Sequence, residues 1–479
     1  MSKYILDWDT RYRKGVIKSS NLESIRLRFS VEDTSGRVNQ RYRNFKVPSR
    51  RYSITAGGRF DIGLGVEIVK YIKEHDALAR VIITDAFKTK LVCKYDFSDT
   101  EIVCPMLDLR DYQIDTVRRC LKVGRGVCDV ATAGGKTLIT SSLISTINAN
   151  IKNNQTVFIT KPSLVKQTHD EFIKHGIPAN HISMWDGKHP LRESKVIIAS
   201  VVSITRTPPD VKWMDKIDLL IVDECHIIRK KNKITKIIEK IKTPHKFGLT
   251  GTLPEEEIDL WQIMGIFGPV IYEKRSHSLI SEGYISRMCI QIMMINYDNA
   301  PVIKPKHDKP REAYELERAF LFNDVKRNSI ITKICDNLDN NILILVDQLA
   351  HGDILRTVLE ENLKRKDVYF IQGSVSQEIR EEVKKLMESK DNIVCVAMSK
   401  IFSTGIDIKN LHFVMFASGG KSKTTIIQSI GRGLRKHESK MKLVVFDIAD
   451  KLHYGIKHHQ KRLKLYDAEK MEYSIHELK

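Results

Sequence analysis

The residues of this chain best suited to chemistry form two short segments. Asp129–Thr140 reads DVATAGGKTLIT, and Leu219–His226 reads LLIVDECH. The first segment predicts a tight turn from a strand into a helix, whose backbone N–H groups can hold phosphates. The second predicts a buried apolar strand that ends in two carboxylates, the groups that phosphoryl transfer with Mg²⁺ needs. Together the segments indicate hydrolysis of a nucleoside triphosphate.

Each residue of the glycine-rich turn has an expected role. The turn comprises Ala133, Gly134, Gly135, Lys136 and Thr137. Lys136 is expected to reach the β- and γ-phosphates, and Thr137 to supply a hydroxyl to Mg²⁺. The match is incomplete on its N-terminal side, because a full P-loop has glycine where Val130 stands. A structural left-handed turn before a helix is therefore the alternative interpretation.

The adjacent carboxylates of Asp223 and Glu224 are expected to have different roles in hydrolysis. Asp223 is expected in the Mg²⁺ shell, and Glu224 is expected to orient and deprotonate the attacking water.

A third segment, Gln428–Arg435, reads QSIGRGLR. On one helical face, Gln428, Arg432 and Arg435 can point together at a γ-phosphate. A solvated basic face would explain this segment alone, but the occurrence of all three segments in this order favours a catalytic role.

These segments resemble the DExH-type superfamily 2 helicases and translocases over nearly the whole chain. Leu109–Gln113, LRDYQ, is similar to the family's adenine-recognition motif, which implies nucleotide contacts by Arg110 and Gln113. Phe402–Asp407, FSTGID, is similar to a motif whose glycine and aspartate contact nucleotide, here Gly405 and Asp407.

The same resemblance implies residues that couple hydrolysis to domain movement. Thr250 and Thr252 in LTGT stand in the family's coupling motif. For His226 it suggests a hydrogen bond to Gln428 across a cleft, with a packed histidine as the alternative. The implied nucleic-acid contacts, mainly with phosphates, are made by Lys161, Ser163, Lys166, Gln167, Ser200, Gly373, Ser399 and Thr404, with Arg380 as a further candidate.

Within the superfamily, the chain most resembles the bacteriophage UvsW-type branch-migration helicases. The resemblance rests on FSTGIDIKNLH, on GGKSKTTIIQSIGRGLRKH and on Phe60–Gly65, FDIGLG. It implies ATP and Mg²⁺ as cofactors and branched DNA as substrate, namely forks and four-way junctions in recombination, replication and repair. A double-stranded DNA translocase or an RNA-directed DExH helicase is the alternative. A DNA-binding module with an inactive ATPase is disfavoured, because the catalytic residue types are intact.

Composition agrees with a nucleic-acid partner. The chain has 79 Lys and Arg against 59 Asp and Glu, a net charge of +20, which favours polyanionic partners and salt-dependent binding. It has no apolar run long enough to span a membrane and no secretory signal at its N-terminus. We therefore expect a cytoplasmic protein without membrane contact, in the host cytoplasm if a phage encodes it. The family resemblance suggests recombination or replication proteins as partners, and we expect a monomer. Eight cysteines without a CxxC pair indicate neither a zinc site nor a disulfide framework.

Short apolar strands alternating with amphipathic helices predict an α/β fold. With the family resemblance, we expect two tandem RecA-like domains, each a parallel sheet flanked by helices, and a small N-terminal α+β domain. The expected divisions are residues 1–100 for an accessory and DNA-binding domain, 101–296 for the first RecA-like domain, 297–310 for a linker, 311–450 for the second RecA-like domain and 451–479 for a basic helical extension. In the second domain, strands are expected at 342–346, 368–371, 393–397, 413–416 and 443–446.

The accessory domain contains one basic segment of ambiguous meaning. Arg37–Arg51 reads RVNQRYRNFKVPSRR and places Tyr42 and Phe45 among cationic side chains. Such a segment can contact duplex DNA near a junction, or it can be the exposed face of a sheet. The sequence leaves both interpretations open.

Overall fold

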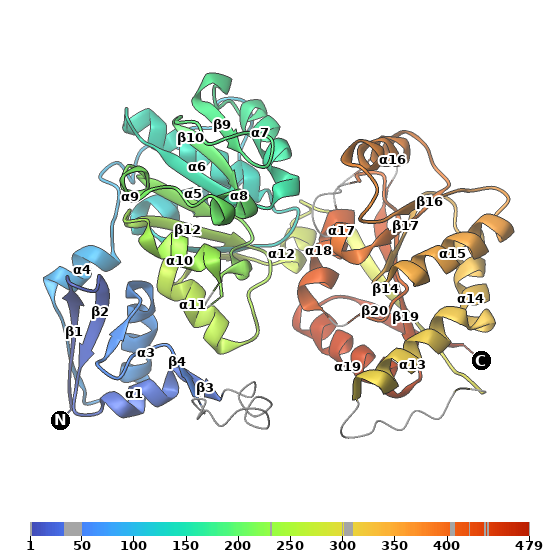
Figure 1. Cartoon of the computed structure of the whole chain (residues 1–479), viewed down its shortest axis with the longest axis horizontal. Coiled ribbons are helices and arrows are strands. Elements are labelled where there is room, and N and C mark those ends of the chain that lie inside the picture. The colour runs from blue at the N-terminus through green and yellow to red at the C-terminus, as the bar shows by residue number, and fades with distance from the viewer. Residues whose placement is uncertain are drawn as a thin grey trace. The chain divides into compact units, whose positions relative to one another are not determined.

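The chain divides into two compact units, each built around a seven-stranded sheet (Figure 1). The first unit comprises Met1–Val130 and Gly135–Glu273, and the second comprises Ala131–Gly134 and Lys274–Lys479. The computed structural model describes residues 2–32, 50–229, 232–298, 300, 310–402, 408–420, 422–434, 437 and 440–478. Most of the basic segment Arg37–Arg51, together with Thr404, Gly405, Asp407 and Arg435, lies outside the described residues.

The N-terminal part of the first unit is a small α+β fold. Its sheet has the order β5-β2-β1-β6, with β1 Lys3–Asp9, β2 Lys14–Lys18, β5 Arg59–Phe60 and β6 Arg80–Ile83. β1 pairs antiparallel with β2 and parallel with β6. Helices α1 Leu22–Arg28, α3 Gly65–His75 and α4 Asp85–Leu91 accompany it, and β3 Ser30–Glu32 pairs with β4 Arg50–Tyr52. This arrangement confirms the predicted α+β accessory fold.

The accessory fold shares its core with the rest of the first unit. Leu6, Ile68 and Phe87 pack in one cluster with Trp261 of helix α11 Glu257–Phe267. Gly63 allows this close approach, since a Cβ at this position would lie 2.1 Å from the backbone oxygen of Met264. Apolar burial therefore fixes the accessory fold on α11.

The large sheet of the first unit has the order β13-β7-β12-β11-β8-β10-β9. Its strands are β7 Gly126–Val130, β8 Thr156–Thr160, β9 Ile182–Trp185, β10 Val196–Ser200, β11 Leu219–Val222, β12 His245–Thr250 and β13 Val270–Lys274. Every neighbouring pair from β7 to β9 is parallel. Because most of these strands are buried along their whole length, their sequences are continuously apolar rather than alternating.

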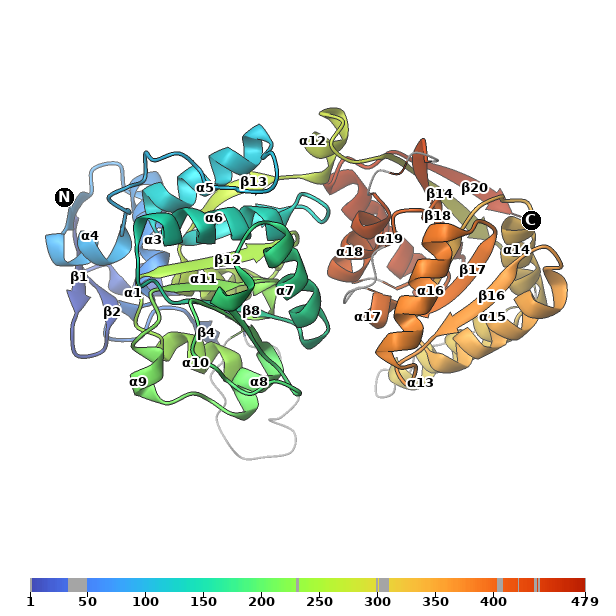
Figure 2. The same cartoon turned by 90° about the horizontal axis from the view of Figure 1, so that it is seen from above.

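Helices cover both faces of this sheet. They are α5 Asp111–Val123, α6 Lys136–Asn150, α7 Val165–Lys174, α8 Val201–Arg206, α9 Val211–Met214, α10 Lys233–Lys240 and α11. Figures 1 and 2 both show β12 between α6 and α10. No helix of the described residues is long and apolar enough to cross a membrane.

The second unit contains a fully parallel sheet of order β16-β17-β15-β18-β19-β14-β20. Its strands are β14 Arg287–Ile295, β15 Ile342–Val346, β16 Asp367–Ile371, β17 Ile393–Met398, β18 Phe413–Phe416, β19 Lys442–Asp450 and β20 Tyr473–Leu478. Its helices are α12 Ser276–Ser281, α13 Pro310–Asn323, α14 Val325–Asp336, α15 Leu349–Asn362, α16 Gln377–Ser389, α17 Ser399–Phe402, α18 Lys423–Gly433 and α19 His453–Ala468. The predicted pair of RecA-like parallel sheets is confirmed.

Two expectations about boundaries need correction. The second unit begins at Lys274 rather than after Asn296, because β14 pairs with β19 and β20 and is part of the second sheet. The segment after residue 450 is not only helical, since β20 follows α19 and pairs along the edge of that sheet. Most of β20 is exposed, so its sequence carries little apolar signal.

Buried ion pairs fix the C-terminal helix of the second unit. Arg462 of α19 contacts Asp447 of β19 through Nη2 and Oδ1 at 2.9 Å, and the two side chains are 1% and 0% exposed. Tyr466 donates its hydroxyl hydrogen bond to the other carboxylate oxygen at 3.0 Å. Since a buried charge is costly without its partner, this contact ties α19 to the sheet.

We expect Asp447→Ala to lower the free energy of unfolding of the second unit by about 3–5 kcal/mol, because Arg462 would be left buried and unpaired. Urea unfolding followed by circular dichroism measures this loss. Lys464→Ala, which removes an exposed charge from the same helix, is the matched control. Equal stability of the two variants would contradict a structural role for the ion pair.

Candidate nucleotide and nucleic-acid site

The glycine-rich turn joins buried strand β7 to helix α6. Ala133 and Gly135 both have left-handed backbone conformations, with φ of 66° and 75°. Glycine suits position 135, since a Cβ on this left-handed residue would be strained and would lie 2.4 Å from Nε2 of Gln113, so that the buried amide would have to move. Lys136 opens α6, and its Nζ donates to the backbone oxygen of Val130 at 3.2 Å. The turn thus places a helix N-terminus and a lysine together, an arrangement suited to phosphate.

The predicted adenine-recognition residues lie beside this turn. Arg110 precedes α5, and its backbone N–H donates to Oε1 of Gln113 at 3.0 Å. Gln113 is 2% exposed, and its amide nitrogen faces Gly135. The Arg110 guanidinium donates to the Tyr112 hydroxyl at 3.3 Å. Two sequence segments predicted to bind nucleotide are therefore adjacent in the first unit.

Asp223 and Glu224 follow β11, which is buried along its whole length. Oδ2 of Asp223 accepts a hydrogen bond from Oγ1 of Thr160, at the end of β8, at 3.1 Å. Burial, and then the neighbouring charge of Glu224, raise the pKa of Asp223 to about 6 against the opposing charge of Lys136. A cation beside Asp223 would relieve this repulsion, so the carboxylate pair fits the expected Mg²⁺.

Glu224 has the opposite electrostatic behaviour. Burial would raise its pKa, but the hydrogen bond from His226 and the charge of Lys136 outweigh burial and lower the pKa to about 2. His226 Nδ1 lies 3.1 Å from Glu224 Oε2, and these side chains are 16% and 14% exposed. Glu224 is thus ionised at neutral pH, the state needed to accept a proton from water.

The described residues contain no cluster of three or more His, Cys, Asp or Glu side chains that could hold a metal ion. This is compatible with Mg²⁺, which commonly keeps several waters and binds through one or two protein groups and substrate phosphates. Thr137 and Asp223 remain the predicted protein ligands.

The predicted coupling residues are connected within the first unit. His226 Nδ1 lies 3.1 Å from Oγ1 of Thr250, at the end of β12. The Thr250 hydroxyl donates to the backbone oxygen of Thr252 at 3.1 Å and accepts from the Thr252 N–H at 3.1 Å. The contacts therefore run from Glu224 through His226 to the LTGT segment. The expected bond from His226 to Gln428 stays a prediction.

Two of the predicted catalytic residues of the second unit, Gln428 and Arg432, lie on α18. Gln428 and Arg432 are one helical turn apart on this helix, and Gln428 is 4% exposed. Their action on a γ-phosphate stays a prediction, as do the roles of Arg435, Gly405 and Asp407, which lie outside the described residues.

Candidate nucleic-acid contacts of the first unit follow β8. Lys161 begins a short turn that contains the exposed Ser163, and Lys166 and Gln167 lie in the first turn of α7. Lys166 pairs with Asp170 at 3.3 Å, and Gln167 donates to Glu171 at 2.9 Å. All four side chains are partly or fully exposed, as contacts with DNA phosphates require.

Two serines in the predicted set have structural roles instead. Ser200 is 1% exposed, and its hydroxyl accepts from the Ser203 N–H at 2.9 Å as the N-cap of α8. Ser399 is 6% exposed and donates to the backbone oxygen of Val346 at 3.1 Å. We therefore omit both from the proposed DNA contacts. Gly373 is exposed, and its carbonyl accepts from Arg380 at 3.0 Å, which gives Arg380 a positioning role.

Sequence reasoning missed Thr160, which holds Asp223 in place. Its signal was a polar residue at the carboxyl end of an otherwise apolar strand, TVFIT. That signal is weak in one sequence, because the pairing of β8 with β11 is needed to show which carboxylate Thr160 meets.

Two protein-family models match the chain. The model of the type III restriction enzyme res subunit matches residues 106–255, and the helicase conserved C-terminal domain matches residues 326–437. The first match includes the glycine-rich turn and the acidic pair, and the second includes Gln428 and Arg432. The two matches fall in different units and leave the accessory fold unmatched.

Two of the relatives that the chain resembles in sequence are named as helicases. The chain is 28% identical to the ATP-dependent DNA helicase uvsW of Enterobacteria phage T4 over 388 residues, covering 76% of each chain. It is 23% identical to a putative DNA 3′-5′ helicase Rad25 of Haloarcula marismortui over 335 residues, covering 69% of this chain and 51% of the relative. A fragment of a putative HsdR subunit of a type I restriction enzyme from Vibrio vulnificus YJ016 has a similar fold, with a TM-score of 0.58, 17% identity and coverage of 91% of each chain.

We expect Lys136→Ala to abolish nucleotide hydrolysis, because the phosphates lose their cation. Glu224→Gln should slow hydrolysis by at least ~100-fold, since water loses its base, while nucleotide affinity is retained. Steady-state turnover and equilibrium binding of a fluorescent nucleotide measure the two effects. Wild-type turnover in either variant would contradict the assignment.

We expect Ser200→Ala to lower stability by about 1 kcal/mol through loss of the helix cap, with DNA affinity unchanged. Ser163→Ala is the matched comparison and should weaken DNA binding without a comparable loss of stability. Thermal unfolding and fluorescence anisotropy with labelled DNA measure these effects. Weaker DNA binding by Ser200→Ala at unchanged stability would restore Ser200 as a contact.

Proposed function

We propose that this chain, a UvsW-like member of the superfamily 2 helicases and an ATP-dependent DNA helicase, acts on branched DNA such as forks and four-way junctions. We expect it to act in recombination, replication and repair of DNA. The observation that carries the proposal is the assembly of the phosphate turn, the carboxylate pair and the LTGT segment at one edge of a parallel sheet. We place this activity in the cytoplasm, which for a phage protein is that of the host.

In the proposed reaction the phosphate turn and residues of the first unit hold the nucleotide. Gly134, Gly135 and Lys136 bind the phosphates, with Gln113 and Arg110 at the base. Thr137 and Asp223 would hold Mg²⁺, which neutralises phosphate charge when bound. Glu224, ionised and held by His226, orients the attacking water and accepts its proton.

The second unit completes the proposed mechanism. Arg432 and Arg435, with Gln428, add positive charge and hydrogen bonds to the γ-phosphate in the transition state. Gly405 and Asp407 add nucleotide contacts. The contacts that run from Glu224 through His226 to Thr250 and Thr252 would couple the presence of the γ-phosphate to the conformation of the rest of the first unit. Repeated binding and hydrolysis would then move the two units as a motor.

The DNA contacts that we propose are Lys161, Ser163, Lys166, Gln167, Gly373 and Thr404. Such hydroxyl, amide and cationic groups bind phosphates, so little base preference is expected. The net charge of +20 supports strong and salt-dependent attraction to DNA. The likeness to the ATP-dependent DNA helicase of phage T4 supports DNA as the substrate. The selection of branched DNA is inferred from the resemblance of the sequence motifs to the UvsW-type helicases.

We expect ATP turnover to rise most with a four-way junction, less with single-stranded or linear duplex DNA, and least with RNA. Strand exchange on the junction should require ATP and Mg²⁺. Parallel assays of turnover and strand separation with these nucleic acids measure both, and the Lys136→Ala protein controls for contaminating ATPase.

Two results would contradict the proposal in different ways. Stimulation by linear duplex without strand separation would identify a duplex translocase. Stimulation mainly by RNA would identify an RNA-directed helicase. Both results would leave the assignment of the ATPase residues unchanged.

A further inference from the structure

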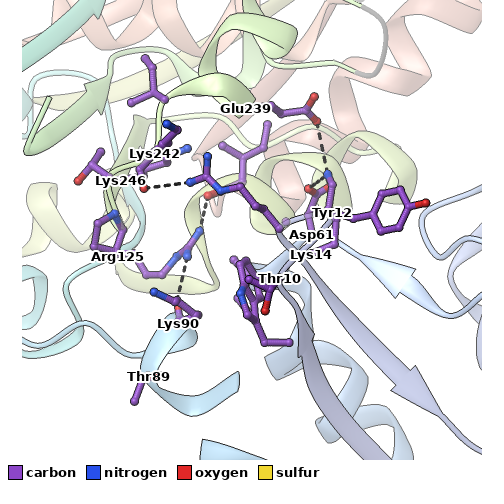
Figure 3. A pocket seen from close by; sticks show the side chains of 18 residues that line it. Thr10, Tyr12, Lys14, Asp61, Thr89, Lys90, Arg125, Glu239, Lys242 and Lys246 are labelled. Atoms are coloured by element: carbon purple, nitrogen blue, oxygen red, sulfur yellow. Dashed lines mark hydrogen bonds and ion pairs between the residues drawn. The ribbon is translucent and has the colours of Figure 1, made fainter. Parts of the chain in front are cut away.

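A cavity of about 550 Å³ opens in the first unit, away from the proposed nucleotide site (Figure 3). It lies where the β1–β2 hairpin and α4 meet the chain before β7 and the start of β12. The phosphate turn follows the end of β7, and Thr250 ends β12. Because β7 and β12 are parallel, the cavity is at the amino edge of the sheet and the proposed nucleotide site is at its carboxyl edge.

Positive charge dominates the lining of this cavity. The cationic residues are Arg13, Lys14, Lys90, Arg125, Lys242 and Lys246, whereas the acidic residues are Asp61 and Glu239. Figure 3 shows Lys14 directed at both acidic side chains. Lys242 pairs with Asp215 at 2.5 Å. Arg13, Lys90, Arg125 and Lys246 form no ion pair with any carboxylate in the described part of the chain.

Two of these four cations are buried. Arg125 is 5% exposed and donates to the backbone oxygens of Ile266 at 2.6 Å, Phe267 at 3.2 Å and Lys90 at 3.3 Å. Lys246 is 9% exposed, and its Nζ donates to the backbone oxygen of Ile238 at 2.9 Å. Carbonyl groups accept these hydrogen bonds but carry no net charge. The buried positive charge is therefore not neutralised by the protein.

The pKa of Lys246 is affected by this excess of positive charge. Burial, and then the positive charges of Arg125 and Arg13, lower its pKa to about 7 against the weaker opposing effect of Asp61 and Glu239. A bound anion would reverse the balance and favour the protonated amine. A small cavity lined by cations that lack a carboxylate partner should bind a compact ligand with several negative charges most strongly.

We propose that this cavity is a second anion site of the protein and binds a small ligand that carries two or more phosphate charges. A volume of 550 Å³ is typical of pockets for small ligands. Trp8 of the hairpin also lines the cavity and offers ring surface to a nonpolar part of the ligand. The ligand would contact both the accessory fold and the first parallel sheet, and its binding would stabilise their association. The proposal goes beyond the helicase function and uses none of its residues.

Inorganic pyrophosphate is the simplest probe of this site. Because the phosphate turn can also bind it, the titration uses the full chain carrying Lys136→Ala. Isothermal titration at pH 7 should detect one pyrophosphate site. Adding Lys246→Met should weaken binding at least tenfold, and adding Arg13→Ala should weaken it severalfold. Lys73→Ala, which removes an exposed lysine of α3 outside the lining, is the matched control and should leave affinity unchanged.

Proton uptake gives a second readout. The charged groups that line the cavity together with Lys246 are Arg13, Lys14, Lys90, Arg125, Lys242, Asp61 and Glu239. Since the anion raises the pKa of Lys246, this lysine should take up a proton when the anion binds at pH 8. Pyrophosphate itself also exchanges protons in this pH range, so the readout is the difference in proton exchange between the parent protein and the Lys246→Met protein. Titrations in buffers of different ionisation enthalpy measure this difference, which should be additional uptake by the parent protein.

Three results would overturn the proposal. They are no binding of millimolar pyrophosphate, unchanged affinity in both the Lys246→Met and Arg13→Ala proteins, and binding only of DNA with a terminal phosphate. Arg13 is exposed on the hairpin, so its variant tests the site even if Lys246→Met folds poorly. Because the titrated protein is designed to lack turnover, failure of this proposal is separate from failure of the helicase mechanism.

Discussion

Parallel pairing of β7, β12, β11 and β8 is the constraint on which the proposed chemistry depends. It brings the carboxyl ends of four strands to one edge, so residues from distant parts of the chain meet there. Thr160 at the end of β8 reaches Asp223 after β11, and His226 reaches Thr250 at the end of β12. A shift in this pairing would separate the phosphate turn from the carboxylates, whatever their sequence.

Electrostatics gives the two neighbouring carboxylates, Asp223 and Glu224, different pKa values. The pKa of Asp223 is raised towards 6 by burial and by Glu224, whereas His226 and Lys136 keep Glu224 ionised. One carboxylate is thus suited to a cation and the other to water. At the amino edge of the same sheet, Arg125 and Lys246 donate to backbone carbonyls and form no ion pair with a carboxylate of the described residues. The two edges therefore present different binding chemistry on one scaffold.

The sequence was most informative where burial is complete. Residues 342–346 and 413–416 were predicted as strands with the bounds that β15 and β18 have, because continuous apolar runs are typical of buried parallel strands. β14 and β20 were missed, since the first alternates in burial and the second is largely exposed. Short motifs located Lys136, Asp223 and Glu224, but only a tertiary contact shows Thr160 on Asp223. The cap made by Ser200 is local, and it was missed because the start of the short helix α8 was not predicted. The cationic cavity joins residues from position 8 to position 266, and no local pattern could predict it.

The central claim is that nucleotide binds at the carboxyl edge of the first sheet. A crystal structure of the full chain with Mg²⁺ and a non-hydrolysable ATP analogue tests it most directly. The account predicts phosphates at Gly134–Thr137, the base beside Gln113, and Mg²⁺ near Thr137 and Asp223. Nucleotide found only in the cavity beside Arg125 and Lys246, with the turn empty, would contradict it.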